Sequence, residues 1–141
     1  MRNVPASTSL LYILLNQGGK NVKYDDILAL PPKKMFLWLQ NQTRVEIPQE
    51  VTTSDELQEV GNAMNKLSSY YAFIMALLSY AQLSVREKKR ESDKEAYEDM
   101  VDRRNVLENT AKSINQQYAA ASRQVTIYLK HMEELKMMGC A

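Results

Sequence analysis

The sequence predicts a mainly all-α protein in which a short mixed segment precedes a long antiparallel helical hairpin or coiled coil. All four prolines lie within the first 48 residues, and neither Gly nor Pro occurs from Asn62 to Met138. Helix interiors exclude both residue types, so this second stretch is expected to be helical. It also carries two runs of apolar residues at alternating spacings of three and four. The chain therefore divides into a mixed segment, 1–50, and a helical part, 51–141.

Residues 1–50 are expected to hold only short elements, each marked by a cap or a helix breaker. Five consecutive apolar residues over 35–39 are too many for one helix face, so this part should contact two surfaces. The expected elements are a helix over 7–16 that ends at Gly18-Gly19, a short strand over 21–24, a turn of helix capped by Asp25-Asp26 and running through Leu30, a helix over 33–40 after Pro32, and an extended linker over 43–51.

The first long helix has a recognisable start. Thr53 and Glu56 form the S/T-x-x-E pattern in which each side chain caps the backbone of the other. The apolar positions that follow alternate in spacing between three and four, which is a heptad pattern. They are Leu57, Val60, Met64, Leu67, Tyr71, Ile74, Leu78, Ala81 and Val85.

The second run has the same alternation and ends near Gly139, a residue typical of helix C-termini. Its members are Met100, Arg104, Leu107, Ala111, Ile114, Tyr118, Ala121, Val125, Tyr128, Met132 and Leu135. Both stripes are wide, so we expect them to form a core and a surface for self-association. We call the contact surface along these two stripes the seam. The residues expected in it are Leu67, Tyr71, Ile74, Leu78, Ile114, Tyr118 and Val125.

Residues 86–99 between the runs are almost entirely charged, and the second heptad is one residue out of phase with the first. Two geometries account for this. A turn near Ser92-Asp93 would fold the runs into a hairpin, which covers both stripes. Alternatively, one continuous rod would absorb the phase shift as a stutter. The sequence favours the hairpin.

The inventory of reactive side chains predicts a protein that is not an enzyme and uses no cofactor, metal or small-molecule substrate. The chain has one histidine, His131, and one cysteine, Cys140, whereas zinc needs three or four convergent ligands. Gly18-Gly19-Lys20 lacks the frame of a phosphate-binding loop. A single cysteine favours a reducing compartment, and no apolar run is long enough for a membrane span. We therefore expect a cytoplasmic protein, or a virion protein if its role is structural.

Basic residues near the predicted tip are candidates for contact with nucleic acid. The candidate set is Lys88, Lys89 and Arg90 on the first arm and Arg123 on a ridge of the second, with Arg103 and Arg104 flanking the same tip. Lysine and arginine bind phosphates electrostatically. Residues 86–104 also contain seven acidic side chains against seven basic ones, so a solvated charged tip is the competing interpretation.

The tyrosines of the helical part allow two interpretations. Aromatic faces stack on unpaired bases, which would suit single-stranded DNA. However, Tyr71, Tyr118 and Tyr128 occupy heptad positions, where a ring belongs to a core or an oligomer interface. The second interpretation is favoured.

The run from Ser122 through Arg123 and Ile127 to Lys136 resembles the C-terminal helix of the T4-type recombination mediators of tailed phages, which load a recombinase onto single-stranded DNA. The resemblance spans residues 62–139 and rests on the helix layout and the Ser-Arg pair. It implies an oligomeric, non-enzymatic accessory protein whose partners are single-stranded DNA and a recombinase. Residues 1–50 are not covered by it.

Three functions fit these observations. The first is the accessory protein just described, acting as a homo-oligomer. The second is a phage virion or assembly protein that bundles with copies of itself, and the third is a small inhibitor or adaptor that presents a helix face to a host protein. All three depend on oligomer or partner surfaces.

Overall fold

The computed structural model describes residues 24–90 and 93–139 as four helices with extended connections and, within those residues, no strand. The helices are α2 (Tyr24–Leu28), α3 (Pro32–Thr43), α4 (Ser54–Arg90) and α5 (Lys94–Met137). The all-α prediction is confirmed. The helix expected over 7–16 and most of the strand expected over 21–24 lie outside the described residues, while Tyr24 begins α2.

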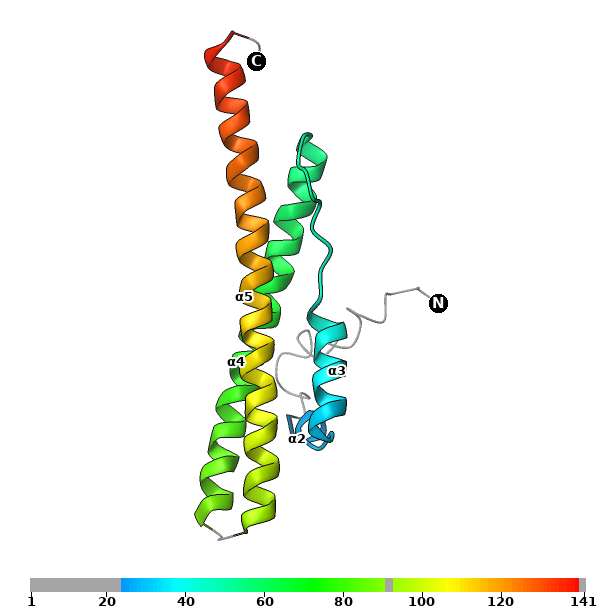
Figure 1. Cartoon of the computed structure of the whole chain (residues 1–141), viewed down its shortest axis with the longest axis vertical. Coiled ribbons are helices and arrows are strands. Elements are labelled where there is room, and N and C mark those ends of the chain that lie inside the picture. The colour runs from blue at the N-terminus through cyan, green and yellow to red at the C-terminus, as the bar shows by residue number, and fades with distance from the viewer. Residues whose placement is uncertain (1–23, 91–92, 140–141) are drawn as a thin grey trace, which may run out of the picture.

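Helices α4 and α5 pack side by side as an antiparallel hairpin (Figure 1). The hairpin prediction is confirmed, and the continuous rod is wrong. The second arm starts at Asp93, whose Oδ1 accepts a hydrogen bond from the Ala96 backbone N–H at 3.1 Å. An aspartate side chain at this position satisfies one of the helix's unpaired N–H groups, so α5 begins directly after the turn.

The predicted capping box at the start of α4 is also confirmed. Thr53 Oγ1 accepts from the Glu56 N–H at 3.1 Å, and the Glu56 carboxylate accepts from the Thr53 N–H at 3.1 Å. Thr52 extends the box, because its N–H and hydroxyl donate to the same carboxylate oxygen at 3.0 and 2.9 Å. These bonds hold the pKa of the Glu56 carboxyl below its ordinary value, and the bond from the Thr52 N–H has the largest effect.

The main core lies along the hairpin and continues into α2 and α3. Side chains from both arms reach complete or nearly complete burial there, both at heptad positions and, at Leu77, beside them. They include Leu67, Ile74 and Leu77 on α4, Leu107 and Ile114 on α5, and Met35 and Leu39 on α3. Segment 24–43 and the hairpin therefore share one apolar interior.

Helix α3 lies against α5 and is longer than the helix expected over 33–40. It continues to Thr43, whose hydroxyl donates to the Leu39 carbonyl at 2.8 Å. Both Gln42 and Thr43 are buried, so tertiary packing extends the helix beyond what sequence propensity indicates. The linker consequently begins at Arg44 instead of Thr43. Helix α2 starts one residue before Asp25 and ends at Leu28, after which the Leu30 N–H closes a turn onto the Ile27 carbonyl.

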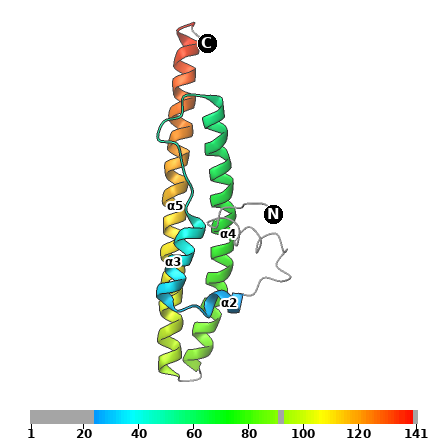
Figure 2. The same ribbon diagram turned by 90° about the vertical axis from the view of Figure 1, so that its right-hand side faces the viewer.

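The extended segment 44–53 continues in the direction of α3 along the hairpin to the start of α4 (Figures 1 and 2). A second apolar cluster forms where it lies, between the beginning of α4 and the later part of α5. Buried Val51, Val60 and Ala121 make up its centre, with Ile47, Leu57, Met64, Val125 and Tyr128 around them. Ala121 is fully buried, which fits the close helix approach that small residues allow.

Beyond this cluster, α5 continues past the start of α4 and projects from the molecule (Figure 2). It ends at Met137, where Gly139 adopts a left-handed φ of 75° and donates its N–H to the Lys136 carbonyl at 3.1 Å. Glycine tolerates this conformation at no steric cost, and the helix end predicted from Gly139 is confirmed. We call residues 129–137 the projecting segment.

Candidate functional site

The basic triad Lys88, Lys89 and Arg90 occupies the last turn of α4, at the tip of the hairpin. Lys89 and Arg90 are exposed and Lys88 is half-buried. The opposing arm begins with exposed Asp93 and Glu95. The tip therefore presents both signs of charge side by side, which weakens its attraction for a polyanion.

Arg123, the fourth candidate for phosphate contact, is exposed but distant from the triad. It lies 30 residues along α5 from Asp93, which corresponds to about 45 Å of helix. Within one chain the structure does not bring the four candidates together. The triad and Arg123 are two separate sites.

Arg103 and Arg104, expected to flank the tip, are engaged within the protein. Arg103 Nε donates to the Leu30 carbonyl at 2.9 Å, and its Nη1 donates to the Asp99 carbonyl at 3.2 Å. Arg104 Nε lies 3.7 Å from a carboxylate oxygen of Glu108. Through these two bonds, Arg103 joins the backbone of its own helix to the connection between α2 and α3.

Gln117 makes two hydrogen bonds to the end of α3 that the sequence does not predict. Its Nε2 donates to the Thr43 carbonyl at 3.1 Å, and its Oε1 accepts from the Val45 N–H at 3.0 Å. One side-chain amide therefore satisfies both backbone groups at the point where α3 ends and the linker begins. No sequence pattern distinguishes it from its exposed neighbour Gln116.

The residues expected in the seam differ in exposure. Leu67, Ile74, Leu78 and Ile114 are buried, while Tyr71 and Val125 are half-buried against the two clusters. Tyr118 is 39% exposed, so the described residues cover this side chain only in part. Tyr70 is buried although it stands outside the heptad, and burial raises the pKa of its hydroxyl.

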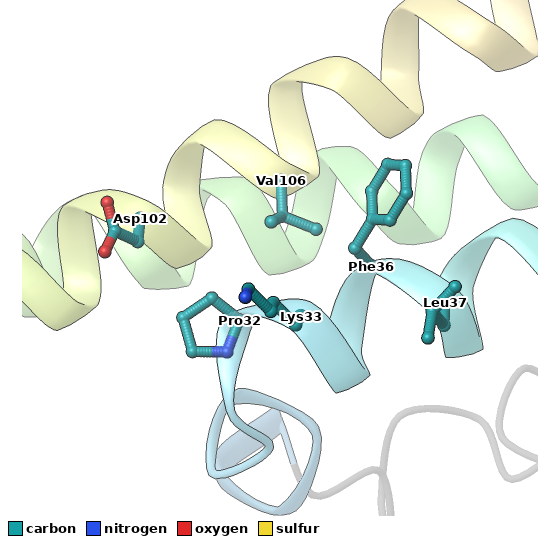
Figure 3. A pocket seen from close by; sticks show the side chains of 6 residues that line it. All are labelled: Pro32, Lys33, Phe36, Leu37, Asp102 and Val106. Atoms are coloured by element: carbon teal, nitrogen blue, oxygen red, sulfur yellow. The ribbon is translucent and has the colours of Figure 1, made fainter.

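An open depression of about 480 Å³ lies between the start of α3 and the facing part of α5. It is lined by Pro32, Lys33, Phe36, Leu37, Asp102 and Val106. The Phe36 ring points from α3 toward α5, with Val106 opposite it (Figure 3). An apolar floor with one cation and one anion beside it suits an apolar side chain of a partner.

The projecting segment continues the apolar stripe of α5. Leu129 follows Val125 by four residues and Met132 follows Leu129 by three, so all three share one face of the helix. Leu129 is 55% exposed and Met132 37% exposed, because α4 does not extend alongside them. Ile127 is 60% exposed but stands two residues after Val125, on the opposite face.

Comparison with protein families, characterised proteins and solved structures found no match to this chain. None of the helices formed by the described residues is long and apolar enough to cross a membrane. Residues 24–90 and 93–139 hold no group of three or more His, Cys, Asp or Glu side chains arranged to bind a metal ion.

Proposed function

We propose that this chain is a non-enzymatic accessory or assembly protein that acts as a homo-oligomer through the exposed apolar stripe of α5. The observation that carries the proposal is that α5 extends beyond the start of α4. The α5 stripe is buried against α4 over much of its length. It then continues in the same heptad register beyond the start of α4, where the described residues leave Met132 exposed.

Side chains of this kind favour association. Leu129 and Met132 are large, apolar and exposed, and Tyr118 adds a third such side chain farther down the helix. Contiguous exposed apolar surface on a soluble protein is typical of an interaction site. The half-buried polar residues Arg103 and Gln117, by contrast, hold the fold of the single chain together.

Sedimentation equilibrium tests the proposal. We expect the apparent mass to rise above the 16.2 kDa of one chain as the concentration increases from about 5 to about 500 µM. A mass of one chain throughout that range would refute self-association. The exposed surface of α5 would then have to bind a different partner.

A second candidate function is contact with single-stranded DNA at the tip, as expected for an accessory protein in recombination. The specific observation in its favour is the triad of adjacent basic side chains in the last turn of α4, two of them exposed. Each phosphate that such a side chain neutralises releases counterion, so binding should weaken as salt rises. Because Asp93 and Glu95 are exposed at the start of the opposing arm, we expect appreciable affinity only when several copies act together.

Fluorescence anisotropy of a labelled oligonucleotide at low salt separates the two basic sites. Changing Lys88, Lys89 and Arg90 together to Ala should reduce binding and flatten its salt dependence. Arg123→Ala should have a smaller effect, since Arg123 lies about 45 Å away along α5. If the wild type shows no binding at tens of micromolar, the DNA function is excluded.

A further inference from the structure

One apolar face of the projecting segment is not packed against α4. Met132, a stripe residue, and Leu129, at the edge of the stripe, continue the face on which Val125 packs toward the start of α4. Any helix that covers them must therefore lie on the line of α4, immediately beyond Ser54. This requirement restricts what can occupy the site.

We propose that a second copy of this chain occupies this position, an inference that rests on the proposed function. The projecting segments of the two copies pack antiparallel about a two-fold axis near Met132. Each copy then supplies the helix that the other lacks. The intermolecular contact continues the seam between α4 and α5 in the same register, and the same residues of both copies take part.

Direction follows from steric considerations. A second α5 running parallel to the first would have its earlier residues on the line of α4 and would collide with that helix. An antiparallel copy instead ends there, because its α5 stops at Met137 and turns away at Gly139. Only the antiparallel arrangement lets two projecting segments pair while both hairpins remain intact.

The paired surface is short. Two helices of nine residues bury less surface than a standard interface, so the pair should be reversible.

Disulfide trapping tests position and direction together. In a Cys140→Ser background, Met132→Cys should cross-link to itself under mild oxidation, because the two-fold axis brings the two copies within disulfide range. Ile127→Cys, which is at least as exposed but on the opposite face, is the matched control and should not. Tyr118→Cys should not either, since the two copies of residue 118 would be about 42 Å apart.

A second pair of variants keeps the test independent of cysteine chemistry. Met132→Lys should lower the association constant at least tenfold, whereas Ile127→Lys should leave it unchanged. Cross-linking through residue 118 or 127, or association that survives Met132→Lys, would overturn the antiparallel pair while leaving self-association established. A wild type that is monomeric throughout would refute the proposed function as well.

Discussion

At the scale of single residues, the connection of α3 to the hairpin depends on two polar side chains of α5. Arg103 binds the Leu30 carbonyl before α3, and Gln117 binds the Thr43 carbonyl and the Val45 N–H after it. Buried Met35 and Leu39 supply the apolar contact between these points. The polar bonds therefore set the ends of the packed helix, and the apolar side chains stabilise it.

Gln117→Leu should destabilise the protein by about 1–3 kcal/mol, because it removes both bonds and leaves two part-buried backbone groups unsatisfied. The free energy of unfolding in urea measures this cost. Gln116→Leu is the matched control, since Gln116 is exposed and neighbours it on the same helix. Equal stability of both variants would show that the Gln117 bonds do not hold α3.

Glu56 gives the start of α4 a dependence on pH. Hydrogen bonds from Thr52 and Thr53 lower the pKa of its carboxyl in the folded state from an ordinary value of 4.5. A lowered pKa means that the ionised form stabilises the fold above that value, and this contribution is lost as the pH falls through the folded-state pKa.

We therefore expect Glu56→Gln to lower the thermal midpoint at pH 7 and to have a smaller effect at pH 3. Thermal unfolding followed by circular dichroism at the two pH values measures the difference. Glu59→Gln, at an exposed position one turn farther along, serves as control. A deficit of equal size at both pH values would contradict the role assigned to the ionised carboxylate.

At the scale of the elements, local signals predicted where the long helices begin and end. The Thr53–Glu56 box and Gly139 are readable because caps act within four residues of sequence. The end of α3 was misplaced because it depends on Gln117, 74 residues away from Thr43. The same reason explains the basic residues: sequence spacing groups Arg103 with the tip, whereas the fold directs it to the Leu30 carbonyl.

Replacing Ile74 or Ile114 with Asp should unfold the hairpin. Both side chains are buried, at 0% and 1% exposure, and an unpaired buried carboxylate costs several kcal/mol, comparable with the stability of a domain of this size. Circular dichroism and the thermal midpoint measure the loss. Unchanged values for both variants would contradict the assignment of these residues to the seam.

At the scale of the whole molecule, the two arms of the hairpin have unequal roles. Helix α4 is covered along its inner face by α5, whereas α5 is covered by α4 only as far as the start of the projecting segment. A heptad pattern predicts the stripe but not which part of it another helix leaves exposed. That part depends on the positions of the turn, the start of α4 and the end of α5 taken together, each of which a separate local signal predicts.

Small-angle X-ray scattering, at concentrations where the protein associates, tests the central claim most directly. One hairpin is about 66 Å long, from the 44 residues of α5 at about 1.5 Å each. Two copies joined through their projecting segments should have a maximum dimension of about 120 Å, because the overlap is only nine residues long. A maximum dimension near 70 Å at twice the mass of one chain would mean that the hairpins pack side by side, and would contradict the account.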